Sequence, residues 1–189
     1  MAIPKVKYTV NLQDLFGARL DLDESTKQAI GQAIIDKIVE RTQNNLDKND
    51  KSLGHYSKSY KATADFAILK GRKNLVDLTA TGDMLAALTI TKMTPQTITI
   101  GFNDTEQNAK AYGHISGFKG HPVLEGLVQE RDFLGLPDGE LENIGSQYES
   151  DANTIDSIQS ATTRDQLNKS ILDYIDELNA QIIPSEEIP

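Results

Sequence analysis

The chain has 189 residues, of which 38% are hydrophobic and 6% aromatic, and its formal net charge at pH 7 is −9. An acidic balance argues against direct nucleic-acid binding, which needs clustered Lys and Arg to displace the counterions of the phosphate backbone. The sequence has no Cys, which excludes disulfides and thiolate metal sites. No apolar run approaches the roughly 18 residues of a membrane span, and the N-terminus lacks the apolar core of a signal peptide. We therefore expect a soluble protein made in a cytoplasm, with no membrane contact.

The first element in chain order is a strand. Val6, Tyr8 and Val10 alternate with polar residues up to Leu12, which predicts a half-buried strand. The acidic stretch that begins at Asp21 is no calcium loop, because its sixth and twelfth positions are Thr26 and Gln32 instead of Gly and Glu.

A long amphipathic helix follows, predicted over residues 25–46. Ser25 with Gln28 fits a capping box at its start. Ile30, Ile34 and Ile38 form one apolar stripe at a spacing of four, which indicates a face that packs on the core.

The middle of the chain is less regular. Tyr56 and Tyr60 share a face if their segment is helical. Residues 64–69 fit a strand or a helix end equally well. Thr81 suits the N-cap of a short helix that carries Met84 and Leu85.

Residues 88–102 predict an antiparallel hairpin. Leu88 and Ile90 alternate with threonines before a break at Pro95, and Ile98 and Ile100 alternate with threonines after it. The glycine-rich residues 113–130 predict a loop-rich segment.

No metal or cofactor site is expected. His114 and His121 are seven residues apart with no third ligand at a suitable spacing. The glycines do not match a phosphate-binding spacing, and no nucleophile and base stand in a known arrangement.

The last third of the chain predicts two further helices. Asp138 suits the cap of a helix over residues 139–148, and the polar residues 149–162 are typical of a linker. Thr163 with Gln166 is a second capping box for a helix over residues 164–182, which Pro184 ends. Its apolar stripe consists of Leu167, Ile171, Ile175, Leu178 and Ile182. The prediction is an α+β domain over residues 1–148 and a helical extension over residues 149–189.

Four segments in order carry a family resemblance. They are GHYSKSY from Gly54, VDLTATGDML from Val76 with the hairpin that ends in Gly101 and Phe102, YGHISG from Tyr112, and RDFLGL from Arg131. Together they resemble the virion morphogenesis family of tailed phages, which includes the Mu-type and P2-type tail completion proteins and related neck proteins. The resemblance covers about residues 25–145; the N-terminal strand and the C-terminal extension depart from the pattern.

The resemblance implies a non-enzymatic structural protein of the virion. Copies are expected to close into a cyclic ring, sixfold like a tail tube, at the head–tail junction or tail end, beside neck, connector or tail-tube proteins. DNA would pass through the lumen without specific binding. The alternative is a generic protein-binding adaptor domain outside the virion, which the residues alone do not separate from the first interpretation.

The predicted contacts lie in two places. Arg131, Phe133 and Leu134 fit an interface and an edge strand about equally well on chemistry, and the resemblance favours the interface, together with Tyr112 and His114. The stripe of the C-terminal helix needs a partner surface, which is either its own sheet or, as we expect, a neighbouring virion protein.

Overall fold

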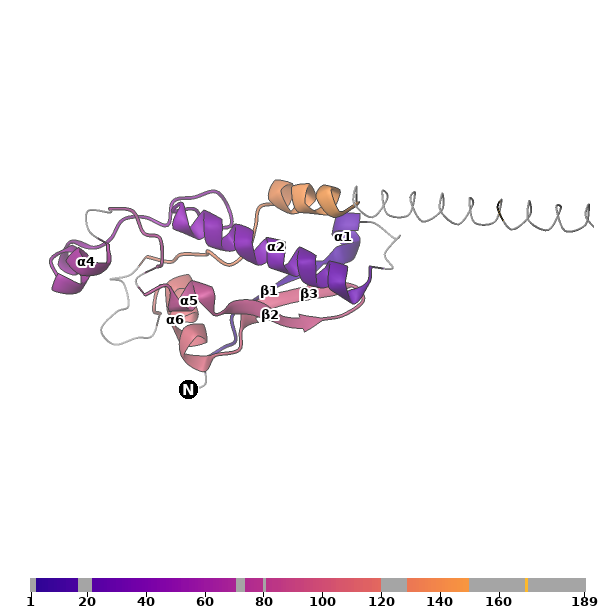
Figure 1. Cartoon of the computed structure of the whole chain (residues 1–189). Helices are drawn as coiled ribbons and strands as arrows, with labels where there is room; N and C mark the ends of the chain where they lie inside the picture. Colours follow the sequence, from indigo (N-terminus) through magenta and orange to yellow (C-terminus); the bar gives the residue numbers. More distant parts are fainter. Residues whose placement is uncertain are drawn as a thin grey trace, which may run out of the picture. The chain divides into compact units, whose positions relative to one another are not determined.

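The structure is a computed structural model that describes residues 3–16, 22–70, 74–79, 81–119, 129–149 and 169. The chain divides into two compact units, Met1–Ser146 and Gln147–Pro189. The predicted linker and C-terminal helix, with Leu167, Ile171, Ile175, Leu178 and Ile182, lie outside the described residues. Within the described part, no helix is both long and apolar enough to cross a membrane. The elements in chain order are β1 (Lys7–Asn11), α1 (Leu12–Phe16), α2 (Glu24–Gln43), α3 (Lys58–Lys61), α4 (Ala64–Leu69), α5 (Asp83–Ala86), β2 (Leu88–Met93), β3 (Thr97–Phe102) and α6 (Thr105–Ser116). All except α3 are labelled in Figure 1.

The first unit is built on an antiparallel sheet of three strands in the order β1-β3-β2. The predicted hairpin is β2 and β3, which pair antiparallel with a bulge between Ile90 and Lys92. β1 pairs antiparallel with the other side of β3, from Lys7 opposite Gly101 to Asn11 opposite Thr97. The predicted α+β class is confirmed.

One face of the sheet is covered by α2, which runs across it (Figure 1). The predicted stripe of Ile30, Ile34 and Ile38 has no exposed surface, and Ile98 and Ile100 of β3 are equally buried. Gly31 sets the distance between the two layers, because a Cβ there would lie 2.4 Å from Cδ1 of Ile90. The helix therefore approaches the sheet more closely than any larger residue permits.

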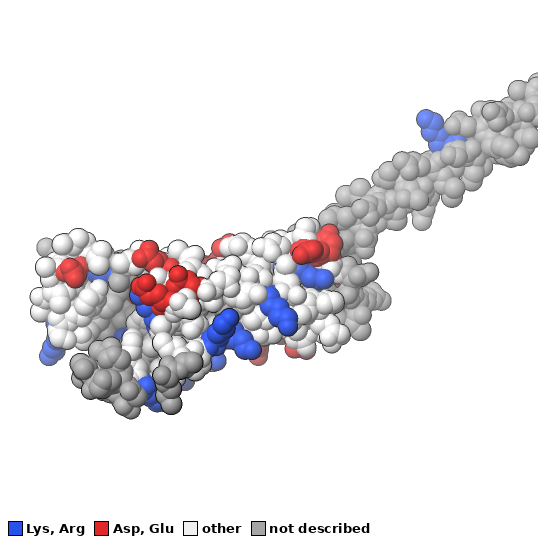
Figure 2. Space-filling view, turned by 90° about the horizontal axis from the view of Figure 1, so that it is seen from below, with Lys and Arg blue, Asp and Glu red and all other residues white. Residues whose placement is uncertain are grey.

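The opposite face of the sheet is polar. Strand partners share a face, so β1 and β3 place Lys7, Thr9 and Thr99 on this side, and β2 adds Lys92. Thr9 and Thr99 are joined through their hydroxyls at 3.2 Å. Seen from the sheet side, Lys and Arg side chains lie over the middle of the molecule and acidic side chains gather in separate groups (Figure 2).

The helix starts differ from the prediction. Asp23, not Ser25, is the N-cap of α2, and its Oδ1 accepts from the backbone N–H of Thr26 at 2.6 Å. Gly82, in the left-handed region, is the N-cap of α5, and Thr81 only accepts from the N–H of Asp83 at 3.4 Å. The helix over residues 138–149 begins at Asp138 itself, one residue earlier than predicted.

Two elements resolve or correct the prediction for the middle of the chain. Residues 64–69, which fitted a strand or a helix, form α4. Residues 113–116, predicted as loop, are the last turn of α6, which Asp104 caps by accepting from the N–H of Gln107. Gly117, at φ 61°, ends this helix in the left-handed conformation that glycine adopts without a steric cost.

Candidate functional site

The segments that carry the resemblance meet at the end of the unit where α3 and α4 lie. The backbone N–H of Val76 donates to the carbonyl of Gly54 at 3.0 Å, and the backbone N–H of Tyr56 donates to the backbone carbonyl of Asn74 at 3.1 Å. Two of the four segments are thereby paired side by side. Their side chains then build a buried polar cluster, called here the Lys70–Asp77 network and consisting of Tyr56, Lys70, Asp77 and Thr79.

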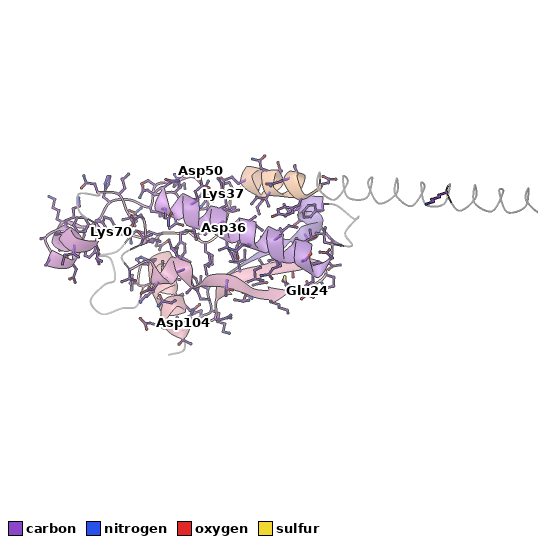
Figure 3. The ribbon with its side chains drawn as sticks, in the orientation of Figure 1. Glu24, Asp36, Lys37, Asp50, Lys70 and Asp104 are labelled. Carbon is purple, nitrogen blue, oxygen red and sulfur yellow. The ribbon has the colours of Figure 1, made fainter. Side chains whose placement is uncertain are left out.

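The network is centred on an ion pair removed from water. The side chains of Lys70 and Asp77 are 2% and 5% exposed, and Nζ of Lys70 binds Oδ1 of Asp77. Lys70 also donates to the hydroxyl of Thr79 at 2.6 Å. Oδ1 of Asp77 accepts from the hydroxyl of Tyr56 at 2.7 Å and from the N–H of Thr79 at 3.1 Å. Lys70 lies at the end of α4 (Figure 3), so the ion pair ties that helix to the segment after residue 74.

These contacts fix the protonation states. Burial alone would raise the pKa of Asp77, but the hydrogen bonds from Lys70, Tyr56 and Thr79 outweigh it and lower the pKa far below its usual range. Burial, and then the bond to the Asp77 carboxylate, raise the pKa of the Tyr56 phenol. Asp77 is therefore a carboxylate and Tyr56 a neutral donor at any physiological pH. Both groups are engaged in holding the structure, which leaves neither one poised for proton transfer.

An aromatic cluster completes this end of the unit. The rings of Tyr56, Tyr60 and Phe66 contact each other pairwise, with centroids 5.2 to 5.5 Å apart. Edge-to-face packing of this kind adds to the area that the rings bury. It attaches α3 and α4 to the Lys70–Asp77 network as one lobe, residues 56–70.

The lobe exposes apolar side chains to solvent. Ile68 is 80% exposed and Leu69 is 48% exposed, and Leu75, just beyond the lobe, is also 48% exposed. Single exposed apolar residues are common on proteins, but adjacent large ones on a short helix are typical of a contact surface.

A second polar contact joins the other two segments of the resemblance. Nε of Arg131 donates to the carbonyl of Leu53 at 3.0 Å, and its guanidinium lies 3.2 Å from Nδ1 of His114. The backbone N–H of Arg131 donates to the carbonyl of His114 at 2.9 Å. Burial, reinforced by the positive charge of Arg131, lowers the pKa of His114 to about 4. His114 is thus neutral at pH 7, and its Nδ1 accepts from Arg131.

The predicted contact residues are placed mostly inside the unit. Phe133 and Leu134 are 1% and 5% exposed within this one chain. Arg131, Tyr112 and His114 are half-buried, and Arg131 donates a charge-assisted hydrogen bond to a carbonyl of its own chain. The side chain of Phe133 packs in the core of its own unit. The involvement of these five residues in a subunit contact stays a prediction.

Two buried polar residues were not singled out from the sequence. Nδ2 of Asn45 donates to the carbonyls of Gly54 and Val76, at 3.0 and 2.7 Å, and so joins the end of α2 to the same paired segments. Arg41, which is 6% exposed, binds Glu140 at 2.7 Å and Asp50 at 2.5 Å.

A depression of about 480 Å³ beside the Lys70–Asp77 network is lined by the amide residues Gln43, Asn44, Asn45 and Asn74 together with Leu75 and Asp77. Within the part of the chain that the structure describes, no three His, Asp or Glu side chains lie close enough to hold a metal ion. The amide lining can donate and accept hydrogen bonds, and the Asp77 carboxylate in the lining is held by Lys70 and Tyr56.

No family model, no curated protein and no solved structure matches this chain.

Proposed function

We propose that the chain is a non-enzymatic structural protein of a tailed-phage virion, which assembles as a ring at the head–tail junction or tail end and leaves a lumen for DNA. The observation that carries the proposal is that the four segments of the resemblance contact one another in two pairs. Gly54 pairs with Val76 and Tyr56 binds Asp77 in the first pair. Arg131 binds His114 in the second pair, and it also binds Leu53, the residue before Gly54. Residues that hold one another in place are expected to occur together in a family. Four chance matches are not expected to contact one another in the folded chain.

The chemistry of the site supports a structural role. The ionised groups of the Lys70–Asp77 network are paired and buried, and the pKa shifts stabilise fixed charge states. Active sites more commonly hold groups whose pKa lies near the working pH. The network is better suited to holding the residue 56–70 lobe in a fixed position, with its apolar tip available for a neighbouring subunit.

The charge distribution bears on the passage of DNA. Residues 147–189 contain nine Asp or Glu and two Lys or Arg, which accounts for −7 of the total charge of −9. The first unit is therefore nearly neutral. A near-neutral wall neither binds phosphates strongly nor repels them strongly, as a channel for DNA requires.

The test is a joining reaction. Heads and tails from a phage that lacks the chain are mixed with the purified full-length protein, and joined particles are counted by electron microscopy together with infectious titre. We expect the protein to restore joining. An Ile68→Ser variant should restore it less well than an Asp65→Ser variant, which changes another exposed position of the same helix.

If the purified chain folds normally but does not join heads and tails that lack it, the proposal is refuted and an adaptor role is favoured. Equal joining by the two α4 variants would show that the lobe is not part of the contact, but it would leave the proposed ring untested by this comparison.

A further inference from the structure

The sheet ends in an open strand. β1 pairs with β3 on one side only, and among the described residues no backbone hydrogen bond joins Lys7–Asn11 to any other element. Unpaired strand edges are templates for pairing with another chain, and proteins usually protect them.

The free backbone groups of β1 can be assigned from the ladder. The N–H of Leu12 donates to the carbonyl of Gln96 at 2.8 Å, so these two residues stand at a hydrogen-bonded position of the ladder. Because hydrogen-bonded and non-hydrogen-bonded pairs alternate in an antiparallel ladder, Val10 and Tyr8 form the next bonded pairs with β3. The N–H and C=O groups of Lys7, Thr9 and Asn11 therefore point away from the sheet.

The two edges of the sheet differ in protection. β2, at the other edge, carries the bulge between Ile90 and Lys92 and an exposed lysine, both of which discourage pairing. β1 has an uninterrupted register over five residues. It also lies beside a groove of about 270 Å³ that follows residues 8–11.

The groove suits the side chains of a second β1. It is lined by Leu15 and Leu141, which are half-buried, and by the carboxylates of Asp14, Asp138 and Glu142. The apolar residues suit inward-pointing side chains of an added strand. The acids favour a strand that carries lysines.

The sequence of β1 is complementary to itself when two copies run antiparallel about Thr9. Thr9 then faces Thr9 of the second copy, and Lys7 faces Asn11 in both directions, so that all the outward backbone groups are paired. On the inner side Tyr8 faces Val10. Threonine pairs and aromatic–β-branched pairs both favour antiparallel pairing, and no two like charges are opposed.

Charge favours the same arrangement. Antiparallel pairing carries Lys7 of each copy, with the exposed Lys5 before it, toward the end of the other β1 and its acid-lined groove. A parallel arrangement would place lysine beside lysine instead.

We propose that β1 is a self-association edge, through which two copies of the chain form an isologous dimer whose sheets join antiparallel about Thr9. The contact is closed with two copies, so it differs from the head-to-tail contacts that build a ring. The inference does not depend on the virion role.

The test uses the full-length chain in sedimentation-velocity experiments over a series of concentrations. We expect a reversible monomer–dimer equilibrium for the unchanged chain. Thr9→Glu, which opposes two carboxylates across the dimer axis, should weaken the dimer at least about tenfold. The matched control is Thr91→Glu. Thr9 and Thr91 are both exposed, both lie on edge strands, and each bonds Thr99 through its hydroxyl, at 3.2 Å in both cases.

A mixing experiment makes the test specific to the axis. Thr9→Glu and Thr9→Lys should each be mainly monomeric alone, and an equimolar mixture of the two should dimerise. Unchanged urea midpoints for both variants show that the strand itself is intact.

Four outcomes would overturn the proposal: a chain that is monomeric at every concentration, a mixture that stays monomeric, a dimer that survives Thr9→Glu, and a dimer that Thr91→Glu disrupts equally. None of them bears on the joining of heads and tails, so failure of this inference and failure of the proposed function are distinguishable.

Discussion

Replacing Lys70 by Met tests the Lys70–Asp77 network, because it removes the buried ammonium group that binds Oδ1 of Asp77. Removing one partner of a buried ion pair costs about 3–5 kcal/mol in proteins. Asp77 keeps its hydrogen bonds from Tyr56 and from the N–H of Thr79. We therefore expect a loss near the lower end, about 3 kcal/mol, and a melting temperature lower by roughly 6–12 °C for a unit of this size.

The assay is urea unfolding of the full-length chain, followed by circular dichroism. The chain has no Trp and six Tyr, so tyrosine emission gives a second probe that includes Tyr56. The control is Lys110→Met, which breaks the exposed pair of Lys110 with Glu106, 2.8 Å apart, and should change stability little. The double variant Lys70→Met with Asp77→Leu should be more stable than the sum of the two single losses predicts, by about 1–3 kcal/mol.

Two results would refute this reasoning. If Lys70→Met costs no more than Lys110→Met, the ion pair contributes nothing beyond a surface contact. If the two single changes are additive in the double variant, Lys70 and Asp77 act independently and do not form one network.

Three further predictions follow from the described contacts. Folding lowers the pKa of His114 from about 6.5 in the unfolded chain to about 4, so the free energy of unfolding falls by about 3 kcal/mol as the pH drops through this window. Urea midpoints at pH 7 and 4.5 measure this loss, and His114→Gln should reduce it. Arg131→Ala leaves the carbonyl of Leu53 and Nδ1 of His114 without a donor and should lower the free energy of unfolding by about 2–4 kcal/mol. The pKa of His114 should rise in an NMR titration. An unchanged urea midpoint would mean that Arg131 serves only a subunit contact. Gly31→Ala should destabilise by about 1–3 kcal/mol in thermal unfolding although alanine favours helices, since its Cβ meets Ile90; a stabilised variant would show that the layers can separate freely.

The strand and helix patterns were predictable where burial alone sets them. The stripe of α2 and the alternation in the hairpin are both produced by one apolar face, and that face is visible in the sequence. The N-cap of α2 was not predictable from the sequence, because Asp23 and Ser25 both suit the position and only the backbone geometry selects Asp23.

The sequence does not predict the end of α6, because its glycines are typical of a loop. Gly113 is buried in the helix, where a Cβ would lie 2.4 Å from the ring of Phe118. It is needed for close packing and not for a turn. The capping pattern of Asp104 followed by Gln107 was the signal that would have located the helix.

The ion pairs depend on tertiary contacts that a single sequence does not reveal. Lys70 and Asp77 are seven residues apart, and nothing in the pattern predicts that the lysine points inward. Arg41 did leave a signal, since it follows Ile38 at a spacing of three and so continues the apolar stripe of α2. A cation in that position indicates a buried partner, which the structure identifies as Glu140 and Asp50.

Electron cryomicroscopy of purified virions, made with and without the chain, shows whether the chain forms a ring in the particle. We expect a closed ring of density around the DNA channel at the head–tail junction or tail end, into which the first unit fits with the residue 56–70 lobe at a subunit or partner contact. Particles that lack the chain should lack the ring and remain unjoined or incomplete. Complete, infectious particles without the chain, or virions that contain none of it, would contradict the account.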